Sequence, residues 1–394
     1  MRSLEPVMVK GRILRTRDPC PAAFPSLFTH IALAIPKLFC IFAADMDIRQ
    51  YTNEAVELLK RLISTPSVSR DEGRAADVFE QQARDWGLPV SRIGNNILIQ
   101  GELDVQKPTL LLNAHIDTVK PVATWTRDPF SPTMEADRLY GLGANDCGGG
   151  LVSLLQVYRM LHGSCSSYNL VYLASCEEEV SGAGGFTMAL PVLPKIDVAI
   201  VGEPTGMQPA IAEKGLMVID GIAHGKSGHA ARNEGVNAIY EALDDLVWLR
   251  DYRFRKESTL LGPTKMTVTV LNSGTQHNVI PDECRFVIDV RTNEYYTNEY
   301  LFSFLQKHVK SELKARSFRL SSSHIPVEHP LIQRCIERGM TPFGSPTLSD
   351  QALMPFLSFK LGPGDSARSH SADEYICISE IEQAIETYIA LLSA

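Results

Sequence analysis

Short apolar runs alternate with helical patterns over the first half of the chain. Apolar residues recur at helical spacing from Thr52 and again over 75–86 and 150–161, which predicts three helices. Four further apolar runs have the length of buried strands: 96–100, 109–113, 169–174 and 197–201. Buried strands separated by helices indicate a mostly parallel sheet with helices on both faces, the pattern of an α/β protein.

The pattern changes after Lys214, where polar and apolar residues begin to alternate. This alternation predicts half-buried strands over 216–223, 265–271 and 285–290, and helical spacing predicts helices over 235–249 and 298–315. Such a set is typical of an open sheet with helices on one side, that is, a separate α+β unit. From about Leu331 the helical and strand patterns of the first half of the chain return. We therefore expect one domain formed by 46–215 and 327–394, with a second domain, 216–326, inserted into it.

Length and charge agree with this picture. A chain of 394 residues is too long for one ordinary core, and its net charge of −8 argues against a nucleic-acid backbone as partner. The eight cysteines are scattered without a C-x-x-C pair, which favours reduced thiols in a cytoplasm. Cys147 and Cys176 stand beside candidate ligands, but we interpret them as packing residues.

The first 45 residues differ from the rest. Several basic residues precede an apolar stretch from Phe28 to Ala44, which has the outline of a signal peptide. Pro36 and Lys37 interrupt this stretch, and it is too short to span a bilayer. We interpret residues 1–45 as an extension outside the fold, with Met46 as the natural start, and we expect no membrane partner and a cytoplasmic location.

Candidate metal ligands follow the predicted strands. His115 and Asp117 come directly after the strand 109–113, and Asp146 lies in a glycine-rich turn before the helix 150–161. Ligands bind beyond the carboxyl ends of strands in open α/β sheets, so these side chains should meet there. Taken singly, H-x-D also fits a capped loop, and Asp146 also fits a helix N-cap.

Further acids and a second histidine extend the set. Glu177, Glu178 and Glu179 follow the strand 169–174, Glu203 follows the strand 197–201, and His370 lies in a loop of small and polar residues. Imidazole and carboxylate ligands suit Zn²⁺, and there are more of them than one tetrahedral ion can use. The sequence therefore predicts two metal ions, with one of the adjacent glutamates left free to accept a proton from water.

Five sequence motifs resemble a known family of metallohydrolases, namely that of acetylornithine deacetylase, succinyl-diaminopimelate desuccinylase and aminoacylase. The motifs stand in the order A-H-I-D-T, G-A-N-D-C-G-G, C-E-E-E-V-S-G, G-E-P-T-G and G-K-S-G-H-A-A, and the resemblance covers roughly Asp47 to the C-terminus. It implies a catalytic domain that holds two zinc ions per subunit, with Co²⁺ able to substitute. It also implies an inserted lid domain that often forms a homodimer.

The resemblance also implies roles for single residues. His115 and Glu203 would hold one zinc ion, Glu179 and His370 the other, and Asp146 would bridge them. Asp117 would orient His115, and Glu178 would be the general base. The family often has Asp at the position of Glu177.

Lid positions match as well. His229 matches a histidine that reaches the active site of the partner subunit and stabilises the oxyanion. Asn278 and Arg291 match positions that contact the carboxylate end of the substrate. The loops 345–350 and 362–366 look closest to those of acetylornithine deacetylase, and Asp350 is a candidate partner for a side-chain ammonium.

The function expected from these residues is amide hydrolysis. The leading hypothesis is removal of an acetyl or succinyl group from a small N²-acyl-L-ornithine-like amino acid, in arginine biosynthesis. The alternatives are a dipeptidase or aminopeptidase, or a succinyl-diaminopimelate desuccinylase, of the same fold. A non-catalytic metal-binding protein is a remote alternative, because a binder needs no free base such as Glu178 beside Glu179. A nucleotide site is disfavoured, since Gly141-Leu142-Gly143 lacks the rest of a phosphate loop.

Overall fold

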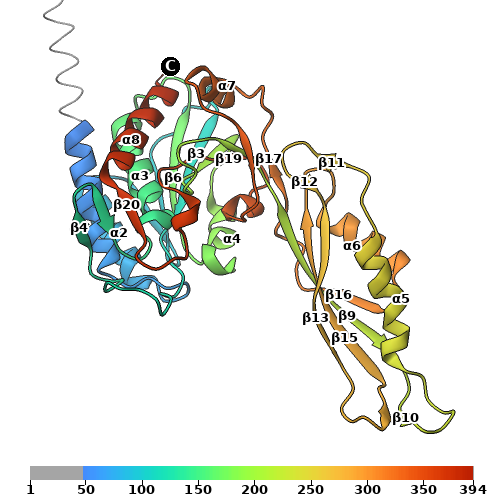
Figure 1. Cartoon of the computed structure of the whole chain (residues 1–394). Helices are drawn as coiled ribbons and strands as arrows, with labels where there is room; N and C mark the ends of the chain where they lie inside the picture. The colour runs from blue at the N-terminus through green and yellow to red at the C-terminus, as the bar shows by residue number, and fades with distance from the viewer. Residues whose placement is uncertain (1–47, 394) are drawn as a thin grey trace, which may run out of the picture. The chain divides into compact units, whose positions relative to one another are not determined.

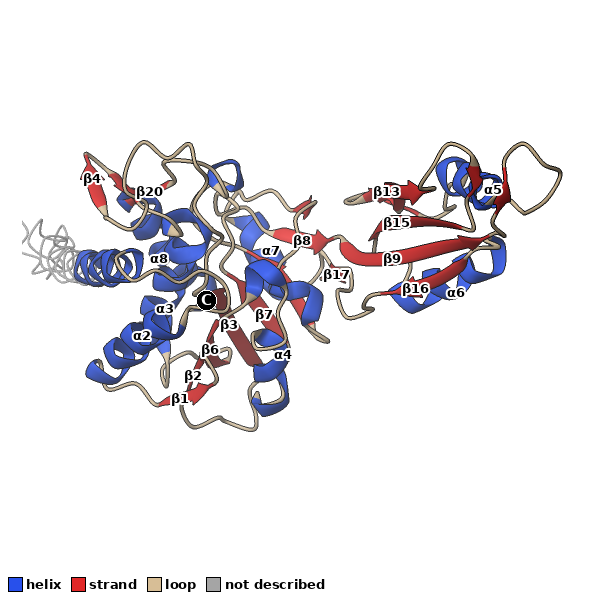
Figure 2. Ribbon diagram, turned by 90° about the horizontal axis from the view of Figure 1, so that it is seen from below, coloured by secondary structure: helices blue, strands red, loops and turns tan. Residues whose placement is uncertain are grey.

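The computed structural model describes residues 48–393 (Figure 1). The expected extension, residues 1–45, lies outside the described residues. Two sheets dominate the described part, and Figure 2 shows them from below. None of the described helices is long and apolar enough to cross a membrane.

The larger sheet has nine strands in the order β1-β2-β6-β3-β7-β19-β8-β17, with β18 paired to β8. Its strands are β1 (Val90–Ile93), β2 (Asn96–Gln100), β3 (Thr109–His115), β6 (Asn169–Ser175), β7 (Val198–Val201), β8 (Ala210–Glu213), β17 (Ser323–His324), β18 (Phe343–Ser345) and β19 (Leu357–Lys360). The four middle strands, β6, β3, β7 and β19, run parallel, whereas β1, β2, β8 and β17 pair in antiparallel fashion. The chain is thus an α/β protein whose central sheet is mixed.

Alternate residues of the middle strands pack into cores on opposite faces of this sheet. Leu110 and Leu112 of β3 join the core beneath α3 (Gly149–Leu161) and α8 (Ile378–Leu392), whereas Leu111 joins the core beside α4 (Phe186–Ala189). The helical residues 48–63 and α2 (Gly73–Asp85) belong to the first of these cores. Burial on both faces explains why these strands are apolar throughout.

The smaller sheet has four antiparallel strands in the order β13-β15-β9-β16. They are β9 (Gly215–His224), β13 (Lys265–Ser273), β15 (Glu283–Thr292) and β16 (Glu312–Ala315). Every second residue of β9 is buried, and Met217 and Ile219 share a core with residues of α6 (Asn298–His308) and α5 (Ala238–Asp251). Both helices therefore cover the same face of this sheet.

The structure corrects one predicted helix. The helix expected over 298–315 ends at His308, and residues 312–315 form β16. The carboxylate of Asp245 accepts hydrogen bonds from the backbone N–H groups of Lys310 and Ser311 and from the Ser311 hydroxyl. These bonds hold the chain in a turn, which frees it to pair with β9.

The strands of the smaller sheet come from a continuous stretch, whereas those of the larger sheet come from both sides of it. The chain leaves the larger sheet after β8 and returns to it at β17. β17 pairs with β8 although it precedes residue 326, the boundary expected from the sequence. Small sheets complete the described part: β20 (Tyr375–Cys377) with β5 (Arg138–Tyr140) and β4 (Thr133–Glu135), β10 (Gly228–His229) with β14 (Val279–Ile280), and β11 (Glu257–Ser258) with β12 (Gly262–Pro263).

Candidate active site

His115 is the last residue of β3, and its ring is buried at the carboxyl end of the larger sheet. Nδ1 lies 2.8 Å from the backbone carbonyl oxygen of Asp117, so that Nε2 faces the neighbouring acids. Nε2 is 3.3 Å from Oδ1 of Asp146 and 3.8 Å from Oε1 of Glu203. A ring nitrogen held by a carbonyl on one side and surrounded by carboxylates on the other is the arrangement of a metal-binding histidine.

The carboxylate of Asp117 was expected to orient the ring of His115, but it forms no hydrogen bond with that ring. Its Oδ1 is 3.7 Å from Nδ1 of His115, too far for a hydrogen bond, so the backbone carbonyl rather than the side chain orients the ring. The carboxylate instead accepts hydrogen bonds from the backbone N–H groups of Glu178 and Glu179 and from the hydroxyl of Ser69. Asp117 thereby holds the turn formed by Glu177, Glu178 and Glu179, hereafter the acidic turn, in place beside His115.

The three adjacent glutamates point in different directions. Glu177 has a positive φ of 52°, and its carboxylate accepts a hydrogen bond from the backbone N–H of Gly184. A Cβ at Gly182 or Gly184 would lie within 2.4 Å of this carboxylate, so the glycines make room for it. Glu178 and Glu179 line the cavity at the end of the sheet. The geometry thus separates Glu177 from the two acids that face the cavity.

Asp146 lies in the turn Ala144–Gly148, which Glu374 supports from below. The buried carboxylate of Glu374 accepts hydrogen bonds from the backbone N–H groups of Gly143, Asn145 and Asp146, at 3.2, 2.8 and 2.9 Å. Sequence reasoning missed Glu374. In the sequence Glu374 is only an acidic residue four positions after His370, and no local pattern shows that its loop packs against the turn of Asp146.

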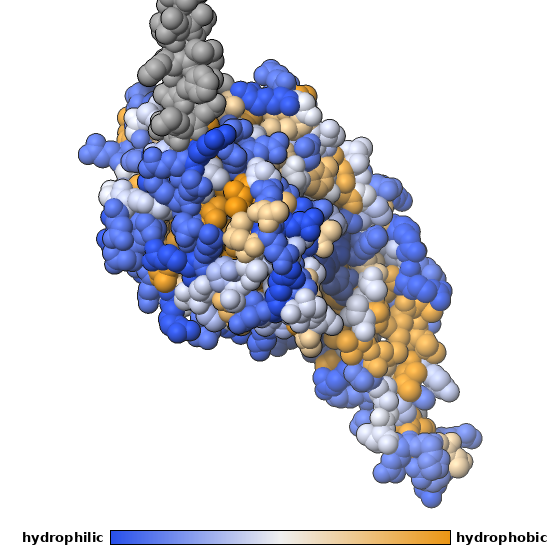
Figure 3. All heavy atoms as spheres, turned by 60° about the vertical axis from the view of Figure 1, so that its left-hand side comes forward, coloured by the Kyte–Doolittle hydropathy of each residue, from blue (hydrophilic) through white to orange (hydrophobic). Residues whose placement is uncertain are grey.

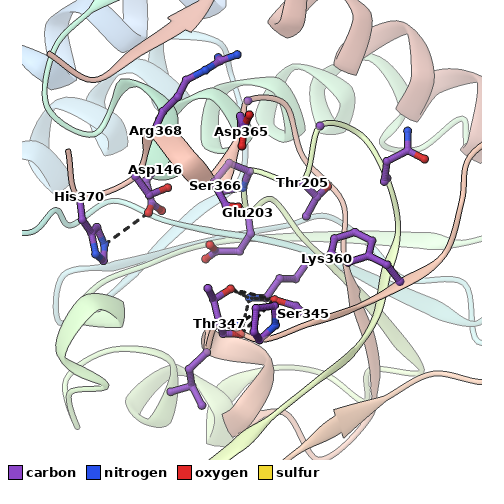
Figure 4. Close-up of a pocket in the computed structure, with 18 of the residues that line it drawn as sticks. Asp146, Glu203, Thr205, Ser345, Thr347, Lys360, Asp365, Ser366, Arg368 and His370 are labelled. Atoms are coloured by element: carbon purple, nitrogen blue, oxygen red, sulfur yellow. Dashed lines mark hydrogen bonds and ion pairs between the residues drawn. The ribbon is translucent and has the colours of Figure 1, made fainter. Parts of the chain in front are cut away.

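His370 closes the group from the C-terminal side. Its Nε2 is 2.9 Å from Oε2 of Glu179 and 3.6 Å from Oδ2 of Asp146, and Figure 4 shows the ring turned toward Asp146. The hydrogen bond to Glu179 raises the pKa of His370 to about 9. The structure therefore brings together five residues singled out from the sequence: His115, Asp146, Glu179, Glu203 and His370.

The donor set fits hard or borderline divalent cations. One ligand atom each from His115, Asp146 and Glu179 lies within 4.8 Å of the others. The same holds for His115, Cys147 and Glu203. Burial raises the pKa of the Cys147 thiol to about 12, and its Sγ accepts a hydrogen bond of 3.2 Å from the backbone N–H of His115, which agrees with a packing role for this residue.

Repulsion among the acids also points to cations. Burial, together with the charge of Asp146, raises the pKa of Glu203 to about 8. Burial likewise raises the pKa of Glu178 well above its usual range, and Glu203, Asp350 and Glu179 raise it further. Bound cations would relieve this repulsion. The acids line a cavity of about 580 Å³, which is large enough for a small-molecule substrate.

None of the substrate-binding residues expected from the sequence, Asn278, Arg291 and Asp350, is among the residues that line this cavity. Asp350 is buried and accepts a hydrogen bond of 2.6 Å from Ser175, so it lies behind the wall rather than on it. His229 and Asn278 neighbour each other, since the N–H of Ala230 donates to the Asn278 carbonyl. Arg291 forms a two-pronged ion pair with Asp289.

Comparison with known proteins defines the class. Residues 111–394 match the family described as Peptidase family M20/M25/M40. The acetylornithine deacetylase of Proteus mirabilis is 30% identical over 366 residues, which cover 84% of this chain and 94% of that protein. The chain belongs to the M20/M25/M40 peptidase family, and it is an enzyme that hydrolyses amide bonds.

Solved structures share the fold. A tripeptidase from Staphylococcus aureus superposes with a TM-score of 0.67 at 16% identity, covering 87% of this chain and 98% of its own. The Bacillus subtilis YXEP protein, described as a dinuclear metal-binding peptidase from the M20 family, gives a TM-score of 0.64 at 14% identity, covering 88% and 98%. At these identities the likeness concerns the fold alone.

Proposed function

We propose that the protein is a zinc-dependent hydrolase that removes an acetyl or succinyl group from an N²-acyl-L-ornithine-like amino acid. The observation that carries this proposal is the convergence of two histidines and three carboxylates around a cavity, with Glu178 beside them and unused as a ligand. The similarity to acetylornithine deacetylases over most of the chain supports this substrate class. Such an activity would place the protein in arginine biosynthesis, in the cytoplasm.

The chain's own residues divide the work. His115 and Glu203 would hold one zinc ion and Glu179 and His370 a second, with Asp146 between them. Zinc, when bound, polarises a carbonyl group and makes water more acidic. Glu178 takes a proton from the attacking water and delivers it to the nitrogen of the leaving amine. Burial raises the pKa of Glu178, which makes this carboxylate a better proton acceptor than an exposed glutamate.

A substrate panel tests the proposal. N²-acetyl- and N²-succinyl derivatives of ornithine, lysine and diaminopimelate would be assayed beside simple dipeptides, with metal-free protein and with protein reloaded with Zn²⁺ or Co²⁺. We expect turnover of an acylornithine that depends on added metal, and about two bound metal ions per chain by elemental analysis. Preferential cleavage of dipeptides would instead make the protein a peptidase. Metal binding without any turnover would favour a non-catalytic protein.

We also propose that the protein works as a homodimer through its smaller sheet unit. Tyr240, Leu243 and Val247 form an apolar stripe along α5 and are 69%, 47% and 46% exposed. β13 is an edge strand, and its Val270 and Leu271 are also exposed. Apolar residues gather over this unit at the lower right of Figure 3. An exposed apolar stripe beside an open sheet edge is a favourable surface for a second copy.

A dimer would give the three remaining sequence candidates their roles. His229 and Asn278 adjoin at the β10–β14 pair, outside the cavity of their own chain. In a dimer they would reach the cavity of the partner subunit, where His229 would stabilise the oxyanion. Asn278 and Arg291 would contact the carboxylate end of the substrate.

A further inference from the structure

One wall of the cavity carries a buried cation. Lys360 is the last residue of β19, it is 1% exposed, and it lines the cavity together with Ser345 and Thr347. In Figure 4 this group lies on the other side of Glu203 from Asp146 and His370. The wall adjoins the candidate ligand Glu203 on the side away from Asp146 and His370, and the proposed hydrolysis assigns Lys360 no role.

The cation faces the cavity and its counter-ion faces away. Nζ of Lys360 is 2.9 Å from Oε2 of Glu213, whose carboxylate is fully buried and also accepts bonds from the N–H and hydroxyl of Ser349. Glu213 is not among the residues that line the cavity, whereas Lys360 is. Burial opposes the charge on Lys360, but Glu213 together with Glu203 and Glu178 raises the pKa of the amine, so the ammonium is charged at neutral pH. The pair is thus a dipole with its positive end toward the cavity.

Two hydroxyl groups extend this positive end. Nζ of Lys360 donates to Oγ1 and to the carbonyl of Thr347, at 3.2 and 3.1 Å, and lies 3.5 Å from Oγ of Ser345. An ammonium only donates, so a hydroxyl that accepts from it keeps its own proton for another acceptor. The Ser345 hydroxyl has two acceptors on Thr347, Oγ1 at 2.9 Å and the backbone carbonyl at 3.3 Å. Because Ser345 can donate to either of them, Thr347, which is exposed, can keep its own hydroxyl proton for an acceptor in the cavity.

We propose that Lys360, Thr347 and Ser345 form a subsite for a carboxylate at the end of the acyl group, so that the preferred acyl group is a dicarboxylic one such as succinyl. The inference rests on the proposed function and narrows its substrate. Phe343, Pro346 and Leu348 line the same wall and supply apolar contacts for the methylene groups of such a chain. A hydroxyl proton and an ammonium behind it then meet the terminal carboxylate.

The other ends of an acylornithine fit this wall less well. The side-chain ammonium of ornithine carries the same charge as Lys360 and would be repelled by it. The α-carboxylate has other candidates, Arg291 and Asn278. Arg368 also lines the cavity and, like Arg291, forms a two-pronged pair with a carboxylate, that of Glu380, so the test below includes a variant of it.

The test compares acyl groups on the zinc-loaded enzyme. kcat/KM would be measured for N²-succinylornithine and N²-acetylornithine, and the ratio of the two is the readout. We expect the wild-type ratio to favour the succinyl substrate by about tenfold or more. Lys360→Met combined with Glu213→Gln removes both charges at similar volume, and it should lower this ratio about tenfold or more, chiefly through KM. Thr347→Val keeps the shape of the side chain and should lower the ratio in the same direction.

Matched variants separate the proposal from its rivals. A merely structural role of Lys360 would lower kcat/KM for both substrates alike and leave the ratio unchanged, which would overturn the inference. A collapse of the ratio in Arg368→Met but not in the Lys360 variants would assign the carboxylate to Arg368 and also overturn it. N²-acetylornithine α-amide provides a third arm: if the Lys360 variants erase the preference for the free acid over this amide, the subsite binds the α-carboxylate instead.

The failure of this inference differs from the failure of the proposed function. Wild-type enzyme that hydrolyses acetylornithine as well as or better than succinylornithine would overturn the dicarboxylic subsite and leave the deacylase intact. Absence of turnover on both substrates would overturn the deacylase itself, and the subsite with it.

Discussion

At the scale of single residues, the acidic turn shows how one backbone conformation gives identical side chains different environments. The carboxylate of Glu177 accepts a hydrogen bond from the N–H of Gly184, and that of Glu179 contacts His370. The carboxylate of Glu178 lines the cavity and has no hydrogen-bond partner among the described residues. The positive φ of Glu177 starts this divergence, because it turns the first side chain away from the next two.

This geometry predicts that Glu178→Gln retains zinc and loses turnover by about 10²–10⁴-fold, since an amide cannot carry the proton. Elemental analysis and kcat on the best acyl substrate check the result. Glu177→Gln is the matched control, because it changes an acid of the same turn that does not face the cavity. Normal turnover in zinc-loaded Glu178→Gln would remove this residue from its role.

A second prediction concerns Glu374. Its carboxylate is the acceptor for three buried N–H groups around Asp146, so Glu374→Ala should lower the free energy of unfolding by about 3 kcal/mol. Zinc affinity should fall as well, because the same bonds fix the turn that carries Asp146. Urea unfolding and calorimetric titration of zinc provide the measurements, and Glu386→Ala, on the exposed side of α8, is the control. Unchanged stability and affinity would show that water replaces the carboxylate.

At the scale of elements, α7 (Pro330–Glu337) couples a helix to pH. Its N-cap is His329, whose Nδ1 accepts a hydrogen bond from the N–H of Leu331 and must therefore be neutral. Burial lowers the pKa of His329 below the ordinary 6.5. The folded state thus disfavours the protonated form, so this contribution to stability is present above pH 6.5 and is lost as the pH falls from there through the lowered pKa.

We expect His329→Asn to remove this part of the pH dependence, because an asparagine oxygen caps a helix without titrating. Between about pH 7.5 and 5.5 the free energy of unfolding should fall further in the wild type than in the variant. Urea unfolding at both values measures the difference, and the other histidines cancel in the comparison. Equal losses in the two proteins would contradict the assigned role of the imidazole.

The elements also show what the sequence reveals and what it does not. The apolar runs at 96–100, 109–113 and 169–174 became β2, β3 and β6, because strands buried on both faces leave a strong local signal. The same strand ends placed His115 and the acidic turn in one region. The helix predicted over 298–315 ends at His308 in the structure. Its end depends on Asp245, whose carboxylate binds the N–H of Lys310, 65 residues further along the chain.

The parts of the site that were missed share one cause. The support of Asp146 by Glu374, the orientation of His115 by a backbone carbonyl and the pairing of Lys360 with Glu213 all depend on contacts between distant segments or on the backbone itself. No local pattern records such contacts, and a lone Lys or Glu in a sequence is usually a surface residue. The candidate metal ligands left a clearer signal, because residues of several scarce types follow several strands at once.

At the scale of the whole molecule, the proposed dimer predicts complementation between two inactive proteins. His229→Ala and Glu178→Gln remove groups that act in one cavity but come from different subunits. After mixing and subunit exchange, about a quarter of the wild-type activity should return, because half of the dimers are mixed and each of these has one complete site. Each variant alone should stay inactive, and Leu243→Glu should yield monomers by analytical ultracentrifugation. Absence of recovery from demonstrably mixed dimers would place His229 outside the partner's site.

The contact between His370 and Glu179 joins positions 191 residues apart in the chain. During synthesis on the ribosome, the larger sheet, the acidic turn and the whole smaller sheet leave the exit tunnel before His370 does. A nascent chain therefore cannot complete the second proposed site until His370 has emerged, whereas His115, Asp146 and Glu203 are available earlier. Of the proposed ligands His370 is the last to be synthesised, so the direction of translation decides which of the two sites can form first.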